Sequence, residues 1–333
     1  MPFPPTAEHD HGASADESGT MIAYILRRLI ATIPVMIVVA LFVFFLLHLT
    51  PGDPAAVIAG DDASPAEIEG IRRKLGLDRP IWEQFGVYVW NLLHGDLGTS
   101  IFSNLPVMTL VMQRLEPSLV LAIATLTIAV ALAIPMGVVA AWKADTGIDR
   151  LVMGFSVLGF AVPVFLVGYL LIYVFAIQLR WLPVQGYRPL SGGIVDTLRS
   201  IALPAFALGM TYMALIARIT RASMLEVLSE DYIRTARAKG VATPSVLLRH
   251  ALKNAAVPIV TVIGIGFALL ISGVVITETV FNIPGLGRLT VDAILKRDYP
   301  IIQGLIILFA GAKVLVNLLV DISYTFFDPR IRQ

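Results

Sequence analysis

Apolar runs of about twenty residues recur along this chain and constrain its fold more than any other feature. A helix rises about 1.5 Å per residue, so each run can cross the roughly 30 Å hydrocarbon core of a bilayer. The runs cover residues 29–49, 117–141, 151–177, 201–217, 257–279 and 300–322. The 333-residue chain is 57% hydrophobic, whereas soluble domains are about 45–50% apolar. The sequence therefore predicts an all-α integral membrane protein with six transmembrane helices.

Basic residues predict how these helices are oriented. Arg27 and Arg28 precede the first run, and residues 218–256, between the fourth and fifth runs, carry seven basic and three acidic side chains. Short cytoplasmic segments of membrane proteins are enriched in Lys and Arg. We therefore expect both termini and residues 218–256 in the cytoplasm. The net charge of +1 gives no indication of a nucleic-acid partner, and the absence of cysteine excludes disulfides and thiolate metal sites.

The first twenty residues differ from the rest of the chain. They are polar, contain His9 and His11, and lack the apolar core of a signal peptide. We expect residues 1–20 to form a disordered tail because they cannot bury enough apolar surface. Residues 21–333 are expected to form one transmembrane domain, and either Met1 or Met21 can be the true start.

Residues 50–116 form the longest polar segment and are expected outside the membrane as a large loop after the first helix. The Ser64-Pro65-Ala66-Glu67 sequence is typical of a helix start, with a helix end at Gly76. Residues 80–93 predict a second, amphipathic helix; one side of it would carry Trp82, Phe85, Val89 and Leu92. Because long loops are usually functional, we favour a surface for a partner protein over a simple cover.

Residues 229–258 predict two short helices joined at a glycine, a segment called the elbow below. Ser229 is expected to cap the first helix, and Gly240 to end it in a left-handed conformation. Thr243 is expected to cap the second helix, with Pro244 at its first position. The apolar face of this helix would carry Leu248, Leu252 and Ala255. Two helices this short need a packing partner, which favours a docking element over a solvated basic loop.

Small residues spaced four apart predict close helix packing in the second and fifth runs. They are Thr125, Ala129, Ala133, Gly137 and Ala141 in the second, and Gly264, Ala268 and Ser272 in the fifth. Pro163 predicts a kink in the third run. Lys313, near the middle of the last run, is expected to face protein or water, most simply a partner helix.

Several strings in the chain resemble the permeases of ABC importers, specifically the dipeptide/oligopeptide family. The strings are PGDPA, KLGLDRP, GDLGTS, YIRTARAKG, RHALKNAAVP, TETVFNIPGLGRL and NLLVDISYTFFDPR. The general importer pattern is Glu-Ala-Ala, three residues, then Gly; only Ala236 and Gly240 match it here. The ARAKG form is nevertheless typical of peptide permeases. The resemblance covers roughly residues 21–333.

This resemblance implies a type I ABC importer permease of the bacterial inner membrane. It implies a second homologous permease, two ATPase subunits and an extracytoplasmic substrate-binding protein as partners, alongside membrane lipid. ATP and magnesium would bind to the ATPases, and this chain would hold no cofactor or metal. The elbow would couple to an ATPase cleft through Tyr232, Thr235, Ala236, Lys239 and Gly240. The substrate-binding residues, the cargo (dipeptide, oligopeptide, glutathione or nickel) and the choice of homodimer or heterodimer stay open.

Two other classes of protein were weighed. An intramembrane enzyme would need a catalytic pair at membrane depth, which the runs do not offer, so no catalytic residue is expected. Residues 190–193 read LSGG, like the start of the ABC ATPase signature, yet the chain has no phosphate-binding GxxxxGK[ST] loop. A stand-alone secondary transporter or channel remains the alternative, although such proteins usually carry several ionisable residues within the membrane.

Overall fold

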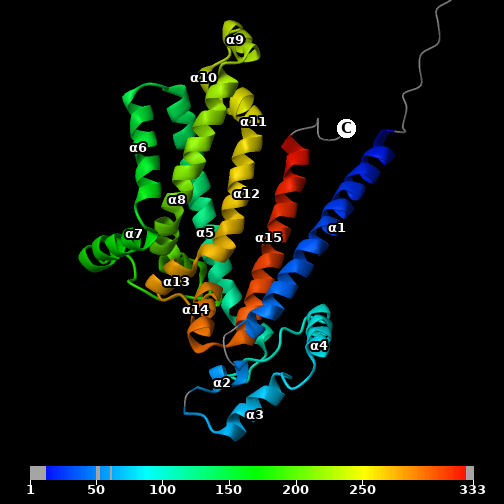
Figure 1. Ribbon diagram of the computed structural model, residues 1–333. Coiled ribbons are helices and arrows are strands. Elements are labelled where there is room, and N and C mark those ends of the chain that lie inside the picture. Colours follow the sequence, from blue (N-terminus) through cyan, green and yellow to red (C-terminus); the bar gives the residue numbers. More distant parts are fainter. Residues whose placement is uncertain (1–12, 50–52, 61, 328–333) are drawn as a thin grey trace, which may run out of the picture.

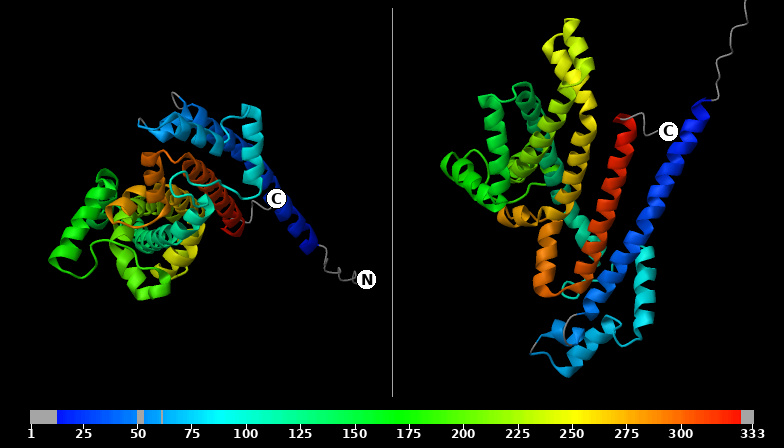
Figure 2. Two further views of the ribbon diagram at one scale, coloured as in Figure 1. Left: turned by 90° about the horizontal axis from the view of Figure 1, so that it is seen from below. Right: turned by 45° about the horizontal axis from the view of Figure 1, so that its top comes forward.

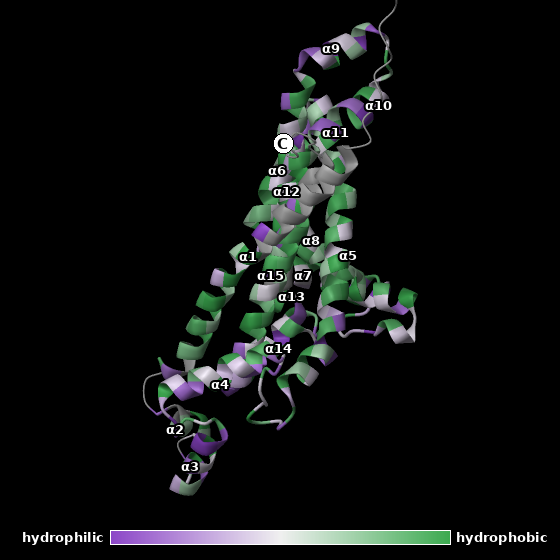
Figure 3. Cartoon of the chain, turned by 90° about the vertical axis from the view of Figure 1, so that its right-hand side faces the viewer, coloured by the Kyte–Doolittle hydropathy of each residue, from purple (hydrophilic) through white to green (hydrophobic). Residues whose placement is uncertain are grey.

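The computed structural model describes residues 13–49, 53–60 and 62–327. Within these ranges the chain is helical apart from its connecting turns, and the single β pairing is an isolated bridge between Thr99 and Pro106. Long helices run side by side through the molecule, and short helices gather at its two ends (Figure 1). Hydrophobic residues dominate the long helices, whereas hydrophilic residues are concentrated in the short helices at the ends (Figure 3). The predicted all-α architecture is confirmed for the described residues.

Three described helices are long and apolar enough to cross a bilayer, namely α5 (Val107–Trp142), α8 (Ile194–Leu228) and α15 (Tyr299–Phe327). Two bent pairs raise this number to five if each pair is one span. The first pair joins α6 (Gly147–Ala161) to α7 (Val164–Leu171) and the π-helix η1 (Ile172–Gln178), and the second joins the helical stretch Thr243–Asn254 to α12 (Ala256–Gly273).

The first expected span lies in α1 (Ala13–His48), where the described apolar part, Ile30–Phe45, is shorter than a full span. The count of six therefore stays a prediction. Helix α1 begins at Ala13, and the expectation of a disordered tail over residues 1–20 stays a prediction. Residues 1–12, with both tail histidines, lie outside the described residues.

The third expected span is interrupted rather than kinked. Helix α6 ends at Ala161, and α7 begins after Pro163, at an angle of 104° to α6. Figure 1 shows α7 lying across the direction of the long helices. Proline lacks the N–H of a helical hydrogen bond, and it also disfavours helical geometry at the preceding residue. Val162, which precedes it, accordingly has an extended backbone.

The centre of the fold is the packing of α5 against α8. All five small residues predicted to form a ridge on α5 are buried. A Cβ added at Gly137 would lie 2.5 Å from the Cβ of Thr220 and 2.7 Å from the carbonyl oxygen of Ala217. This close approach of two backbones requires glycine at position 137, as the four-residue spacing predicted.

Small residues in α12 also approach a neighbouring helix. A Cβ added at Gly264 would overlap Val320 on α15, and Ala268 is buried. The side chain of Ser272, the third member of this predicted ridge, lies outside the described residues. Lys313 on α15 is exposed.

Residues 53–106 form a cap at one end of the molecule, shown in blue and cyan in Figures 1 and 2. Its helices are α2 (Pro54–Ala59), α3 (Pro65–Lys74) and α4 (Ile81–Leu93). The loop expected to reach residue 116 ends earlier, because α5 begins at Val107. Val107 and Val111 are buried against α14 (Leu286–Lys296) and α15, which extends α5 beyond the apolar run.

The predicted helix start in the cap is confirmed in detail. The Ser64 hydroxyl accepts a hydrogen bond from the Glu67 N–H, and the Glu67 carboxylate accepts one from the Ser64 N–H at 2.8 Å. On α4, Phe85, Val89 and Leu92 are half-buried, whereas Trp82 is exposed. Phe85 and Tyr88 both pack on Phe44, so these two residues lie on the side of α4 that faces α1.

Candidate functional site

The elbow projects beyond the long helices at the end opposite the cap (Figure 1). It contains α9 (Asp231–Ala238) and a second arm made of α10 (Thr243–Ser245), the π-helix η3 (Val246–Ala251) and α11 (Leu252–Asn254). The second arm meets α12 at an angle of 64°. The end of α15 lies at the same end of the molecule as the elbow (Figure 2).

The start of α9 differs from the prediction. Helix α8 continues to Leu228, and Ser229 is its C-cap, with a hydroxyl that donates to the Glu226 carbonyl at 2.7 Å. Glu230, which has an extended backbone, occupies the N-cap position of α9, and no side chain caps the helix. The Ser229 cap was therefore wrong, because a serine hydroxyl at the end of a helix can bond back to the preceding turn instead.

The end of α9 at Gly240 agrees with the prediction. Gly240 has φ +77°, its N–H donates to the Arg237 carbonyl at 2.9 Å, and the Val241 N–H donates to the Ala236 carbonyl at 3.2 Å. These two bonds define a Schellman motif. A Cβ built at Gly240 would meet no atom within 4 Å. Glycine is favoured here by its backbone conformation alone, with no steric contact involved.

The second arm begins one residue earlier than expected, and its apolar face agrees with the prediction in part. Ala242 is the N-cap and Thr243 is the first helical residue, so the predicted Thr243 cap was wrong. Leu248 is 61% exposed, against the prediction. Ala255 is buried and Leu252 packs on the same cluster, as predicted, and Val246, Leu247 and Ala251 are buried beside them. A π-helix places more residues in each turn than an α-helix, which rotates the buried face away from the four-residue spacing.

An apolar cluster anchors the elbow to the long helices. Ile233 of α9 is fully buried, and it belongs to the same cluster as Met224 of α8 and Val246 of the second arm. The cluster continues to Ala141 of α5 and Ile259 of α12. Because the packing is continuous, α9 is fixed to three long helices rather than hanging from a loop.

Four of the five predicted coupling residues are exposed on α9 or at its end. They are Tyr232, Thr235, Lys239 and Gly240; Ala236 is half-buried. Tyr232, Ala236 and Lys239 follow three- and four-residue spacing, so they share one side of the helix. The Tyr232 hydroxyl accepts a hydrogen bond from the Asn254 amide at 2.8 Å, which ties the two arms together. The elbow thus presents a small, partly basic surface, and a hydrogen bond between its two arms holds this surface in place.

An ion pair near the elbow escaped the sequence analysis. Arg221 of α8 donates to both carboxylate oxygens of Asp149 on α6, at 2.5 and 2.6 Å. Bidentate pairing fixes both position and angle. The two residues are 72 positions apart, and no spacing in the sequence connects them. Arg221 had been counted only as a positive charge.

A buried glutamate near the cap end also escaped it. Glu278 lies on α13 (Val275–Val280), within the family-like string TETVFNIPGLGRL, and is fully buried. Its carboxylate accepts hydrogen bonds from the Ser118 hydroxyl at 2.5 Å and from the Arg288 N–H at 2.9 Å. A Cβ at Gly285 would overlap this carboxylate. The signal available in the sequence was a single acid between an apolar run and a glycine-rich turn.

The structure offers no sign of a metal centre in the residues it describes, where no three His, Asp or Glu side chains cluster. The 190–193 string forms the short 3₁₀-helix η2 (Leu190–Gly192) and the turn into α8. The elbow exposes hydroxyl, ammonium and backbone groups on an apolar anchor.

Comparison with known proteins gives consistent matches over almost the whole chain. Residues 133–333 match the family model described as "Binding-protein-dependent transport system inner membrane component", and residues 21–133 match the model for the N-terminal part of such membrane components. Among curated proteins, a probable peptide ABC transporter permease of Sinorhizobium fredii is 54% identical over 94% of this chain and 100% of its own length.

Two further relatives and one solved structure also match this chain. A putative peptide transport system permease of Brucella abortus is 47% identical, and the glutathione transport system permease GsiC of Escherichia coli is 44% identical; each match covers 94% of this chain and 99% of the relative. An inward-facing structure of the MetNI methionine ABC transporter matches with a TM-score of 0.56 at 15% identity, covering 66% of this chain and 97% of that one. At this low identity, the match to the solved structure shows a similar fold alone.

Proposed function

Because the chain belongs to the family of binding-protein-dependent transport system inner membrane components, and is an ABC importer permease subunit of the bacterial inner membrane, we propose that it imports peptides or a closely related solute. The observation that carries this proposal is 54% identity to a named peptide permease over its full length. These relatives favour an importer subunit over the stand-alone transporter or channel. Glutathione is itself a tripeptide, so the second named cargo falls within the same chemical class.

The finer architecture is part of the proposal. We infer six spans of the type I importer kind, with the elbow and both termini in the cytoplasm and the cap outside. The basic excess in residues 218–256 and the position of elbow and cap at opposite ends support this orientation (Figure 1). The exposed Lys313 and the exposed apolar faces of the long helices suit a second homologous permease.

We also propose that two ATPase subunits and an extracytoplasmic binding protein complete the transporter. ATP and magnesium would bind to the ATPases, and this chain would bind no cofactor and perform no covalent chemistry. Closure of the ATPases would push on Tyr232, Thr235, Ala236, Lys239 and Gly240. Since α9 shares one packed cluster with α5, α8 and α12, that push would reach the spans directly and bias a two-state change of access.

Substitution of one alanine in the elbow by tryptophan, with a control substitution in the cap, tests this role of the elbow. Ala236→Trp adds a large side chain to the coupling side of α9 and leaves every span untouched. It should abolish ATP-driven peptide uptake and weaken retention of the ATPases on a pull-down, at near-normal membrane levels. Ala66→Trp is the matched control, since Ala66 is exposed on α3 in the cap. Normal uptake and ATPase retention in Ala236→Trp would refute the coupling role.

A further inference from the structure

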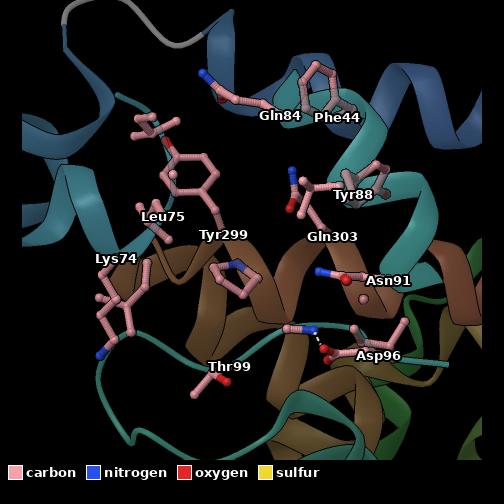
Figure 4. Close-up of a pocket in the computed structure, with 18 of the residues that line it drawn as sticks. Phe44, Lys74, Leu75, Gln84, Tyr88, Asn91, Asp96, Thr99, Tyr299 and Gln303 are labelled. Carbon is pink, nitrogen blue, oxygen red and sulfur yellow. Dashed lines mark hydrogen bonds between the residues drawn. The ribbon is translucent and has the colours of Figure 1, made fainter. Parts of the chain in front are cut away.

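A cavity of about 510 Å³ lies between the cap and the beginning of α15. Its wall is formed by the end of α1, the end of α3, helix α4, residues 96–101 and the first turns of α15. Small-molecule sites usually have volumes of about 300–1,000 Å³, so the cavity is large enough for a solute. Figure 4 shows side chains from these separate elements surrounding it.

The most informative side chain in the wall is Tyr88. Its hydroxyl is buried, and no group of the described protein hydrogen-bonds to it. Burial raises the pKa of Tyr88 to about 12, so the phenol keeps its proton at physiological pH and remains a donor. Buried donors are nearly always paired in native proteins. The oxygen has no accessible surface, so this hydroxyl can gain an acceptor in the cavity only when its side chain turns toward it.

Amide groups stand beside Tyr88. Asn91 lies one turn along α4, and Gln303 of α15 lies between them in Figure 4. The Gln303 amide nitrogen donates to the Val43 carbonyl at 3.0 Å, which fixes the orientation of this side chain. A carboxamide both donates and accepts, so this part of the wall complements a peptide bond.

Residues of opposite charge belong to different parts of the cavity wall. Lys74 and Asp96 lie on opposite sides of it in Figure 4. Lys74 donates to Asn104, and Asp96 accepts from the Gly98 N–H at 2.8 Å; both groups have capacity for further bonds. Two other basic residues of the wall already have acidic neighbours, Arg73 with Glu69 and Arg79 with Glu83. The wall is therefore balanced in charge, unlike a site for a phosphate.

From these contacts we propose that the cavity is a binding site for a short zwitterionic peptide, with its ammonium group toward Asp96, its carboxylate toward Lys74 and a backbone carbonyl accepting from Tyr88 once that side chain turns inward. The choice of a peptide rests on the proposed function, but the cavity is remote from the elbow. It would hold cargo at the cap side of the membrane, separately from the binding protein.

Photolabelling of the assembled transporter tests the site. The probe is tri-alanine with a diazirine side chain at its central residue, applied to the complex in nanodiscs without binding protein. After proteolysis, the label should be found on the fragment of this chain that contains residues 81–93. Unlabelled tri-alanine should prevent this labelling. Asn91→Trp fills the cavity and should abolish labelling, whereas Leu93→Trp, at an exposed position on the same helix, should not. Tyr88→Phe, which removes one oxygen, should weaken binding about threefold to tenfold.

Blocking the ends of the peptide tests its orientation. N-acetylation of tri-alanine should weaken displacement about fivefold in the wild type, as expected for one exposed ionic contact, and should have no effect in Asp96→Asn. C-terminal amidation of tri-alanine should likewise weaken displacement about fivefold in the wild type and have no effect in Lys74→Met. Equal effects of both blocking groups in the wild type and in the variants would refute the proposed orientation.

Three outcomes would overturn the site. One is labelling that is equal in Asn91→Trp and Leu93→Trp, a second is the absence of label from residues 81–93, and a third is a co-purifying phospholipid that leaves only in Asn91→Trp. Uptake of tri-alanine into proteoliposomes separates this inference from the proposed function. Import without cavity labelling refutes the site alone, and labelling without ATP-driven import refutes the proposed function.

Discussion

The elbow and the cap end a short helix with the same backbone motif. Each contains a short helix that ends at a left-handed glycine, Gly240 in the elbow and Gly76 in the cap. In the cap the Gly76 N–H donates to the Arg73 carbonyl at 3.1 Å and the Leu77 N–H to the Arg72 carbonyl at 2.9 Å, the same pair of bonds as in the elbow. Local chain geometry therefore does not distinguish the two regions.

Their attachment to the long helices does distinguish them. The elbow places the fully buried Ile233 in an apolar cluster shared with α5, α8 and α12. No residue of α3 or α4 is fully buried, and a small cluster around Ile58 and Tyr299 links the cap to α15. A buried hydrogen bond of 2.6 Å from Ser100 to Asp298 adds a polar link. The elbow is thus anchored through one apolar cluster shared by three long helices, and the cap through fewer buried contacts.

The largest expected effect concerns the side of the membrane that each region faces. The native chain has no cysteine, so single cysteines can be introduced without background. Asp62→Cys and Ser191→Cys should react with a membrane-impermeant thiol reagent added to intact cells, and Ala242→Cys should not. Ala242→Cys should react after the cells are opened, which serves as its control. Labelling of position 242 in sealed cells would place both regions on one side and refute the orientation.

A second prediction compares the anchors of the two regions. Ile233→Ala removes a fully buried side chain and should destabilise the elbow by about 2–5 kcal/mol. Ile71→Ala, at a half-buried position of the cap, should cost about 1 kcal/mol. Hydrogen exchange should therefore speed up strongly in residues 231–238 in the first variant and only slightly in residues 65–74 in the second. Comparable acceleration in the two variants would show that the anchors are of similar strength.

The smallest expected effect comes from the two glycines. No atom lies within 4 Å of a Cβ at Gly240 or Gly76, so valine adds only backbone strain of about 1–2 kcal/mol at each position. Stability should fall equally in Gly240→Val and Gly76→Val. Function should differ, because Gly240→Val distorts the coupling surface: retention of the ATPases should weaken in this variant alone. A pull-down on both variants, at matched membrane levels, measures this difference, and equal retention would contradict the role of Gly240.

Much of the fold could be predicted from the sequence because the signals were local or strictly periodic. The ridge from Thr125 to Ala141 was correct, since four-residue spacing places small side chains on one face of any α-helix. The Ser64–Glu67 helix start and the Gly240 helix end were also correct, because each depends on atoms within a few residues of chain.

The errors came where a neighbouring element changed a local preference. Leu248 was expected to be buried, but a π-helix rotates that face toward solvent. Ser229 was expected to start α9, but α8 extends through the preceding residues. Proline was expected to kink the third run, while the structure shows a turn of 104° between α6 and α7. The first two outcomes depend on the surrounding helix rather than on the residue type, whereas the third follows from proline and differs from the prediction only in the size of the angle.

The sequence by itself determined that this chain is helical, membrane-embedded and equipped with a jointed basic segment, because apolar length, charge and glycine act within one turn or one run. Only the tertiary structure decided which helices carry that segment, since Ile233 gains its anchor from residues that lie far from it in the chain. It also brought together Asp149 with Arg221, and Lys74 with Asp96 around a cavity. Contacts between distant residues leave no spacing in a sequence, because their distance is set by the packing of whole helices.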